Sequence, residues 1–339
     1  MDFAFESVER SPGSSQQPLT PQQVAAVTRR AFGEHVGIRA AVELGDGAYN
    51  TTYLLSLEPG TNADEDVILR VAPEPARQFR SERRFMRNEH AAAPYFAPLA
   101  PLLPRTLAVD FTHELIGRDY MIQSVVPGVP ARIGLENYPR AAWSSFFRDL
   151  GTISRRLHEV RGEGFGAPAG PLYSTWSEAL AAHLTDMAAD LDASGLESAD
   201  VRVLAETAVR RRDLLDEITE PRLLHGDLWT INVMTVPDAP EPKVSGVFDC
   251  DRAVWGDPES DWAVYRALDR PGTERDGFWD GYGPLRTGAA AHWRRVFYAA
   301  RYLGTVLVER HRLAEPDKVA EGYDALRAVM DRLKDAEPG

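Results

Sequence analysis

The sequence has very little cysteine and no long apolar segment. Its 339 residues include a single cysteine, Cys250. One cysteine excludes an internal disulfide framework and any metal site built from several cysteines, as is usual in a reducing compartment. No apolar run approaches the roughly 20 residues that a membrane helix needs, and the N-terminal segment is acidic and polar where a secretory signal has an apolar centre. We therefore expect a cytoplasmic protein that does not associate with membranes.

Positive charge is also scarce. The chain has 38 Lys and Arg against 51 Asp and Glu, which gives a net charge of −13. This sign repels nucleic acid phosphates and anionic lipid and attracts cationic small molecules. Because the acids are spread along the chain rather than gathered in one arm, the net charge alone does not identify a ligand. We expect a small-molecule partner and no nucleic acid.

The first part of the chain is rich in β-forming residues. We interpret residues 1–19 as a flexible lead-in, and Thr20 followed by Pro21 predicts the start of a helix. Short runs between 38 and 71, separated in part by a polar turn at 58–66, and again at 119–126, predict an antiparallel sheet. The length of the chain predicts two domains, and this β-rich lobe is expected to cover residues 20–127.

Helical patterns dominate after Pro127-Gly128. Apolar residues recur at 3-4 spacing, which is typical of amphipathic helices. The expected helices lie at 143–157, 176–193, 199–218, 290–313 and 317–334. The fold class is therefore expected to be α+β, with a small β-rich N-lobe and a larger helical C-lobe over residues 128–339.

A short β-like island interrupts the helical half and gathers polar residues. The segment HGDLWTIN contains His225, Asp227 and Asn232, and Asp249 and Asp251 follow the apolar run VSGVF. A carboxylate and a carboxamide on one loop, with a second carboxylate brought alongside by a hairpin, supply a base and the hard oxygen ligands that Mg²⁺ requires. A single Asp or Asn at a strand end is usually a turn residue. The order and spacing of the whole set favour a site.

The same segments resemble a known family. The pattern HxDxxxxN, an apolar strand ending in DxD, and then GDPESDWA resemble the catalytic core of the aminoglycoside phosphotransferase and choline kinase family, which has the protein-kinase-like fold. The segment GTISRRLHEV resembles the family's helix that ends in a Leu-His pair. The resemblance implies a bilobal kinase-like fold and Mg²⁺-dependent transfer of the γ-phosphoryl group of ATP or GTP to a hydroxyl of a small molecule.

The resemblance assigns roles to the acids of the island. It implies that Asp227 is the catalytic base and that Asn232 and Asp249 hold the magnesium ion. Asp251, the second acid of the DxD motif, is expected to reach a second metal through water.

Two further residues of the island are expected to support the loop. The resemblance implies that His225 braces it through hydrogen bonds. Asp261 is expected to tie its backbone down from the helix that follows.

The resemblance also assigns the nucleotide phosphates to the first lobe. Gly45 and Gly47, in LGDGAYNTTYLL, resemble a loop that covers phosphates, where glycine lets backbone N–H groups approach anionic oxygens. An ordinary hairpin turn is the alternative. Arg70, in VILRV, occupies the position of the family's phosphate-contacting cation, and the alternative is a solvated strand arginine.

The partner of Arg70 is expected to be a glutamate on the next helix. Glu89 fits the family pattern better than Glu82, but spacing alone does not separate the two, and a surface helix acid is the alternative. The segment MIQSVVPG resembles the connection between the lobes. Backbone groups of Ser124 and Val126 are expected to meet the nucleotide base there.

The sequence leaves the acceptor open. The resemblance implies a hydroxylated natural product as acceptor and favours an antibiotic. Regions 173–193 and 258–283, which shape the acceptor pocket in relatives, carry several acids and favour a cationic acceptor. Acids on a solvated face are the alternative. Two other functions remain: a metabolic kinase for choline, ethanolamine or amino alcohols, and a catalytically silent nucleotide-binding protein, because 229–231 replace the Pro-Gly common in this loop.

Overall fold

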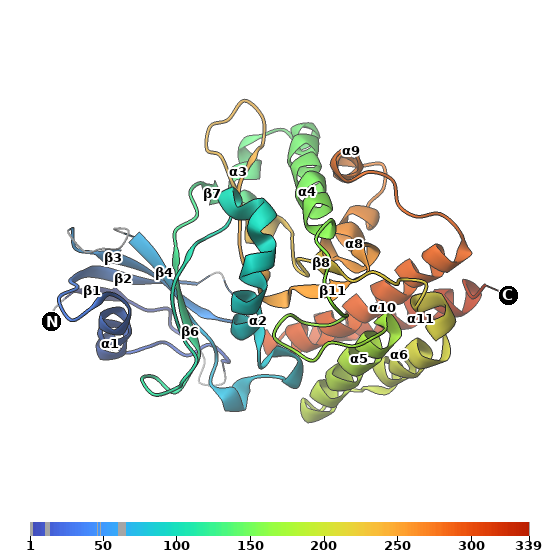
Figure 1. Cartoon of the computed structure of the whole chain (residues 1–339), viewed down its shortest axis with the longest axis horizontal. Coiled ribbons are helices and arrows are strands. Elements are labelled where there is room, and N and C mark those ends of the chain that lie inside the picture. Colours follow the sequence, from blue (N-terminus) through green and yellow to red (C-terminus); the bar gives the residue numbers. More distant parts are fainter. Residues whose placement is uncertain (1–2, 11–13, 46, 48, 60–65, 339) are drawn as a thin grey trace. The chain divides into compact units, whose positions relative to one another are not determined.

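The chain divides into two compact units. The structure, a computed structural model, describes residues 3–10, 14–45, 47, 49–59 and 66–338. One unit comprises Met1–Phe79 and Leu103–Val126, and the other comprises Arg80–Leu102 and Pro127–Gly339. A sheet dominates the first and helices dominate the second, which confirms the expected α+β class (Figure 1).

The first unit is built on a six-stranded sheet with the order β1-β2-β3-β4-β6-β5. β1 is parallel to β2, and the other neighbours are antiparallel. The strands are β1 (Ala4–Glu6), β2 (Ile38–Leu44), β3 (Thr51–Leu57), β4 (Asp66–Val71), β5 (Thr106–Asp110) and β6 (Tyr120–Ser124). β1 arises from the segment interpreted as a lead-in, and the polar turn expected at 58–66 lies largely outside the described residues.

One helix covers this sheet. α1 (Pro21–Phe32) begins after Thr20, whose side chain accepts a hydrogen bond from the N–H of Gln23 in a capping box, with Pro21 in the first turn. Alternate residues of β3 are buried, as expected for a strand with one face on a core. Val24 and Val27 of α1 pack in the same apolar cluster as this buried face.

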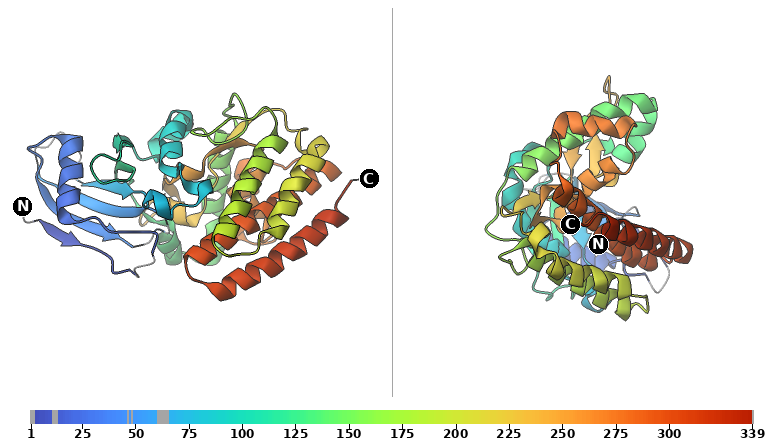
Figure 2. Two further views of the ribbon diagram at one scale, coloured as in Figure 1. Left: turned by 90° about the horizontal axis from the view of Figure 1, so that it is seen from below. Right: turned by 90° about the vertical axis from the view of Figure 1, so that its right-hand side faces the viewer.

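The second unit is mainly helical (Figure 2). α5 packs against α6, α10 against α11, and α4 against α9. Its helices are α2 (Phe85–Ala92), α3 (Ala131–Gly134), α4 (Trp143–His158), α5 (Trp176–Ala193), α6 (Ala199–Arg210), α7 (Arg212–Leu215), α8 (Trp262–Leu268), α9 (Gly277–Tyr282), α10 (Ala289–Arg312) and α11 (Pro316–Asp335).

The expected helices are present with two differences. The segment 199–218 forms two helices, because Arg211 leaves helical geometry with φ −103° and ψ 35°. Residues 94–104, whose prolines are expected to break any helix, are not fully irregular. The chain continues as 3-10 turns over Ala93–Leu102, with Pro98 and Pro101 inside.

Two small sheets hold the polar island of the sequence. β7 (Val129–Pro130), β9 (Val233–Thr235) and β10 (Val244–Val247) form one sheet in the order β10-β9-β7. β8 (Arg222–Leu224) and β11 (Val254–Gly256) form the other. β9 and β10 are antiparallel, with Val233 opposite Val247. The residues before β9 and after β10 are therefore brought to the same end of this hairpin.

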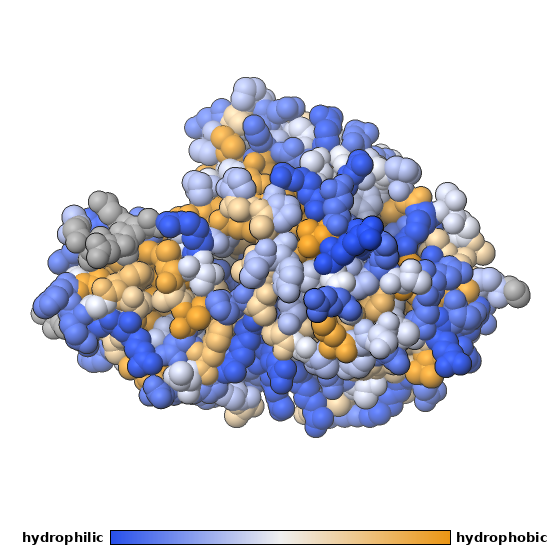
Figure 3. All heavy atoms as spheres, viewed as in Figure 1, coloured by the Kyte–Doolittle hydropathy of each residue, from blue (hydrophilic) through white to orange (hydrophobic). Residues whose placement is uncertain are grey.

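Polar side chains cover much of the face seen in Figure 3, and apolar residues gather there in smaller groups. Among the described residues, every helix is too short or too polar to cross a membrane.

Candidate active site

The loop that leaves β8 can form only with glycine at 226. Gly226 has a φ of +81°, and a Cβ atom there would lie 2.2 Å from the carbonyl oxygen of Arg252. No side chain fits at that distance, and positive φ already disfavours other residues. The backbone between His225 and Asp227 is thus held close to the segment that follows β10.

Asp261 fixes the backbone of this loop. Its carboxylate accepts hydrogen bonds from the N–H groups of His225 (3.1 Å) and Gly226 (3.0 Å), and the side chain has no exposed surface. His158 Nε2 lies 3.0 Å from the same carboxylate. Burial alone would raise the pKa of Asp261, but these hydrogen bonds and the nearby histidines outweigh burial and hold the pKa below its usual value.

His158 was not singled out by sequence reasoning. It is the last residue of α4, and its other ring nitrogen lies 2.9 Å from the hydroxyl of Tyr282 on α9. The ring therefore links α4 and α9 to Asp261 and, through it, to the loop. The Leu-His pair at the end of the segment GTISRRLHEV was the signal that could have identified this residue.

His225 is buried beneath the loop. Burial lowers its pKa, so the ring is neutral at ordinary pH. Its Nδ1 accepts a hydrogen bond from the N–H of Asp227 at 3.3 Å, and its Nε2 lies 3.6 Å from the sulfur of Cys250. The imidazole therefore connects the loop to the segment after β10.

Asp227 and Asn232 face each other across this loop. The Asn232 Nδ2 donates hydrogen bonds to the carbonyl oxygen of Asp227 (2.8 Å) and to its carboxylate (3.0 Å). These bonds use the amide nitrogen, so the amide oxygen is turned away from Asp227 and stays available to another group. Asn232 itself is buried, with 5% of its surface exposed.

The Asp227 carboxylate is partly exposed, and charges surround it. Its side chain keeps 24% of its surface accessible, and Arg252 Nε lies 4.0 Å from its Oδ2. Burial, together with the charges of Glu309 and Asp249, raises the pKa of Asp227 to about 7 against the opposing effects of Arg252 and Asn232. A carboxylate with this pKa can accept a proton near neutral pH.

Asp249 lies at the same end of the hairpin as Asn232. The N–H of Phe248 donates to the carbonyl oxygen of Asn232 at 3.1 Å. Asp249 follows with φ 63° and ψ 55°, a left-handed conformation that turns the chain sharply out of β10. Asn232 and Asp249 therefore lie at the same end of the hairpin, close enough to Asp227 for the charge of Asp249 to raise the pKa of Asp227.

Asp251 is buried, and α2 holds the backbone around it. Asn88 on α2 donates from Nδ2 to the carbonyl oxygens of Asp251 (2.9 Å) and Ala253 (2.8 Å). Its Oδ1 accepts from the N–H of Ala169 at 3.0 Å. Sequence reasoning missed Asn88, because nothing in its local sequence indicates partners this distant.

These oxygens suit a hard divalent cation. Mg²⁺ usually binds one or two protein oxygens and keeps several waters. Asn232 and Asp249 supply one oxygen group each, which fits that pattern. Across the part of the chain that the structure describes, no group of three His, Cys, Asp or Glu could hold a metal by itself.

The residues expected at the nucleotide phosphates lie in the first unit. Gly45 follows β2 and Gly47 precedes β3, while residues 46 and 48 are outside the described chain. Arg70 is on β4, opposite Thr52 and Met121, with 8% of its surface exposed.

The residues expected at the nucleotide base also lie in the first unit. Ser124 ends β6, and its N–H already bonds to the carbonyl oxygen of Arg105 at 2.9 Å. Val126 follows two residues later, at the end of this unit.

Both candidate glutamates belong to the second unit. Glu89 is buried on α2, with 6% of its surface exposed. Glu82 is also buried and forms an ion pair with Arg312 of α10. Glu82 therefore has an arginine partner within its own unit.

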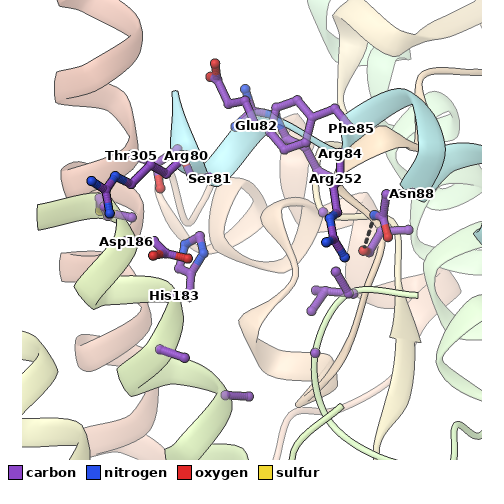
Figure 4. A pocket seen from close by; sticks show the side chains of 18 of the residues that line it. Arg80, Ser81, Glu82, Arg84, Phe85, Asn88, His183, Asp186, Arg252 and Thr305 are labelled. Carbon is purple, nitrogen blue, oxygen red and sulfur yellow. Dashed lines mark hydrogen bonds between the residues drawn. The ribbon is translucent and has the colours of Figure 1, made fainter. Parts of the chain in front are cut away.

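A cavity of about 440 Å³ opens beside the loop (Figure 4). Gly226 and Arg252 line it on the side of Asp227. The other walls come from the start of α2, from α5 and from α10.

The order and geometry of these segments agree with a known family. A family model described as the phosphotransferase enzyme family matches residues 40–296. The chain belongs to this family. The resemblance carried by HxDxxxxN and DxD is thereby confirmed, and the chain is an enzyme of the small-molecule phosphotransferase type. No curated protein sequence matches this phosphotransferase.

Solved aminoglycoside phosphotransferases are similar to it in fold. An apo form of a thermostable mutant of APH(4)-Ia is 18% identical, with a TM-score of 0.64 over 93% of this chain and 100% of the other. A ternary complex of a mutant of that enzyme with ADP and hygromycin B is 17% identical, with a TM-score of 0.60 over 94% of this chain and 99% of the other. The GDP complex of aminoglycoside 2'-phosphotransferase-IIIa is 16% identical, with a TM-score of 0.60 over 93% of this chain and 99% of the other. At identities this low, the likeness shows the fold alone.

Proposed function

We propose that this phosphotransferase moves the γ-phosphoryl group of Mg²⁺-bound ATP or GTP to a hydroxyl of a small natural product, including an antibiotic. The observation that supports it is the loop anchored by Asp261, in which Asn232 orients Asp227 while the β9–β10 hairpin brings Asp249 alongside. The nucleotides bound in the similar structures, ADP and GDP, support a nucleoside triphosphate donor.

Asp227 is the proposed catalytic base. The acceptor hydroxyl gives its proton to the Asp227 carboxylate as its oxygen bonds to the γ-phosphorus. The bond from that phosphorus to the β,γ-bridging oxygen breaks, and the nucleoside diphosphate leaves with that electron pair. The Asn232 amide holds the carboxylate in position through the 3.0 Å hydrogen bond.

Asn232 and Asp249 are the proposed metal ligands. When bound, Mg²⁺ neutralises charge on the phosphates and aligns them. The chain contributes the Asn232 oxygen, which is left available because its amide nitrogen bonds to Asp227, and the Asp249 carboxylate. Asp251 would reach a second metal ion through a water molecule. His225 and Asp261 would keep the loop in shape from below.

The first unit would supply the nucleotide contacts. Gly45 and Gly47 would cover the phosphates with backbone N–H groups, and Arg70 would contact them with its guanidinium.

The proposed partner of Arg70 is Glu89, because Glu82 already pairs with Arg312. For the nucleotide base, Val126 is favoured over Ser124, whose N–H is already bonded to Arg105.

The substitution Asp227→Ala tests this function. It should leave ATP or GTP binding nearly unchanged but lower turnover by about two to four orders of magnitude, the range of general-base catalysis. Calorimetry measures nucleotide binding. Mass spectrometry of a panel of hydroxylated antibiotics and amino alcohols detects the product as an added phosphate of about 80 Da. Asp324→Ala, at an exposed acid of α11, is the matched control.

The alternatives predict different results. Unchanged turnover in Asp227→Ala refutes the role of Asp227 as base. A native protein that binds nucleotide but neither hydrolyses it nor phosphorylates any acceptor is the catalytically silent alternative. Products confined to choline, ethanolamine or amino alcohols would identify the metabolic kinase.

A further inference from the structure

The cavity beside the loop has apolar walls suited to a small organic molecule. Phe85, Trp176, Leu180, Met187 and Val308 line it. Its volume of about 440 Å³ lies within the range of small-molecule sites, which are mostly apolar with a few placed polar groups. The charged groups of the walls therefore decide which molecules it admits.

Two of the four acids that line these walls, Glu82 and Glu309, are paired with arginines. Glu82 forms an ion pair with Arg312, and Glu309 forms one with Arg252. A carboxylate engaged by an arginine has little negative potential left for a ligand ammonium group. Asp186, an exposed acid on α5, also lines the cavity. Pairing with arginine thus weakens the attraction that these two of the described wall acids, Glu82 and Glu309, would exert on a polycation.

Arg301 is the opposite case. It lies on α10, lines the cavity and has 9% of its surface exposed. Its guanidinium donates to the carbonyl oxygen of Ser260 at 3.1 Å and lies 4.4 Å from the centre of the Tyr302 ring. Among the described residues, no carboxylate lies within ion-pairing distance of Arg301, and its Nε has no hydrogen-bond partner.

A buried cation without a counter-ion is unfavourable. A bound anion placed against Arg301 would supply the missing partner. Arginine suits a carboxylate because its planar group can donate two parallel hydrogen bonds.

His183 indicates that the surrounding potential is positive. It lines the cavity from α5, and Figure 4 shows it among the wall residues. Burial and the charges of Arg301 and Arg252 lower the pKa of His183 to about 3. The imidazole is therefore neutral at ordinary pH. It does not compete with Arg301 for a bound carboxylate.

We infer that the acceptor of this phosphotransferase has an apolar body, a hydroxyl and a single carboxylate, and that the carboxylate pairs with Arg301. This inference rests on the proposed function for the hydroxyl, which is directed to the side of the cavity where Gly226 and Arg252 lie next to Asp227. Arg301 is then a specificity-determining residue that favours hydroxy acids over polycationic aminoglycosides.

Binding of three matched probes tests the inference without catalysis. The probes are para-hydroxymethyl benzoate, its neutral carboxamide and the corresponding benzylamine, titrated onto the full native chain and followed by ligand-observed NMR. We expect the carboxylate to bind about tenfold or more tightly than the amine, because it alone makes a charge-assisted bond with arginine. Equal or tighter binding of the amine, or no binding of the carboxylate at millimolar concentration, overturns the inference.

Variants assign the preference to Arg301. Arg301→Gln should remove the preference for the carboxylate, and Arg301→Lys should keep part of it. Arg310→Gln on the same helix, at an arginine that pairs with Glu315, is the control and should change nothing. If Arg301→Gln does not fold, the Lys variant and the three probes on native protein still decide the outcome. An unchanged preference in a folded Gln variant overturns the assignment.

Activity is measured separately, so the two proposals can fail independently. Carboxylate binding that depends on Arg301, without any phosphorylated product, would uphold this inference and refute the proposed transfer. Phosphorylation of a polycationic acceptor, with no preference for a carboxylate in binding, would support the proposed transfer and refute this inference.

Discussion

A single buried carboxylate sets the geometry of the loop at the residue scale. Asp261 accepts two backbone N–H groups and is itself held by His158. Because hydrogen bonds to a charged acceptor are stronger than neutral ones, the loop is held before any ligand arrives. Such preorganisation lets a site act without rearranging during the reaction.

Gly226 gives the sharpest prediction at this scale. We expect Gly226→Ala to lower the free energy of unfolding by about 2–4 kcal/mol, because the new Cβ would meet the Arg252 carbonyl at 2.2 Å in addition to the strain of positive φ. Turnover should fall as well, since the loop must move to relieve the clash. Urea unfolding and a transfer assay measure the two effects.

Gly195→Ala is the matched control for that change. Gly195 also has positive φ, at +71°, but nothing lies within 4 Å of the position that the new methyl group would take. Only the backbone strain of about 1 kcal/mol should remain. Equal losses for the two variants would show that the contact with Arg252 is unimportant.

At the scale of elements, α2 supports the segment that follows β10. Asn88 joins this helix to the carbonyl oxygens of Asp251 and Ala253, and to the N–H of Ala169. These three bonds connect parts of the chain that are far apart in sequence. The position of Asp249 and Asp251 thus depends on a helix that carries neither residue.

Asn88→Ala tests this support. We expect a loss of about 2–4 kcal/mol in the free energy of unfolding, because two buried carbonyl groups and one N–H lose their partner. Thermal and urea unfolding measure the change, and Asn137→Ala, at an exposed position, is the control. A loss no greater than that of the control would mean that water or nearby groups replace the side chain.

The elements also show what the sequence reveals and what it conceals. The 3-4 spacing in α4 and the Thr20-Pro21 start of α1 are local signals, and both helices were predicted from them. The motif residues 225–232 and 249–251 are likewise close in sequence, so their association through a hairpin could be expected. Asn88 lies 163 residues from Asp251, and no local pattern predicts a contact at that separation.

The same limit applies to charge. Sequence composition counts arginines and acids but does not pair them, so from sequence alone the acids of regions 173–193 and 258–283 favour a cationic acceptor. Only the fold shows that two acids outside those regions, Glu82 and Glu309, line the cavity and are paired, while Arg301 lacks a carboxylate among the described residues. Short strands such as β1 and β5 were missed because a few residues carry too little periodicity.

In the whole molecule, many ionisable groups are buried rather than on the surface. The acidic excess of the chain coexists with buried arginines and with a neutral, buried histidine, His225. Stability should therefore depend on pH through groups whose protonation differs between the folded and unfolded chains.

His183 makes this dependence testable. The unfolded chain takes up a proton near pH 6.5, whereas in the folded chain the pKa is about 3. Stability should therefore fall as pH decreases from about 6.5 towards 3, by less than about 1.4 kcal/mol per pH unit because the ring is only partly buried. His183→Gln should flatten this part of the profile.

Urea unfolding of native protein and of His183→Gln at several pH values measures the difference in slope. His292→Gln, at an exposed histidine of α10, should leave the profile unchanged. Parallel profiles for the native protein and His183→Gln would show that the imidazole titrates normally in the folded chain.

Two selective pressures act on helix α10, one from the stability of the fold and one from the cavity. Tyr302 donates its hydroxyl proton to the carbonyl oxygen of Ser260, next to Asp261, so that residue is constrained by the stability of the fold as well as by the cavity, which it also lines. Thr305 and Val308 follow within two turns and line the cavity. Substitutions at those later positions would thus change which acceptor binds during evolution, while the residues of the catalytic loop stay the same.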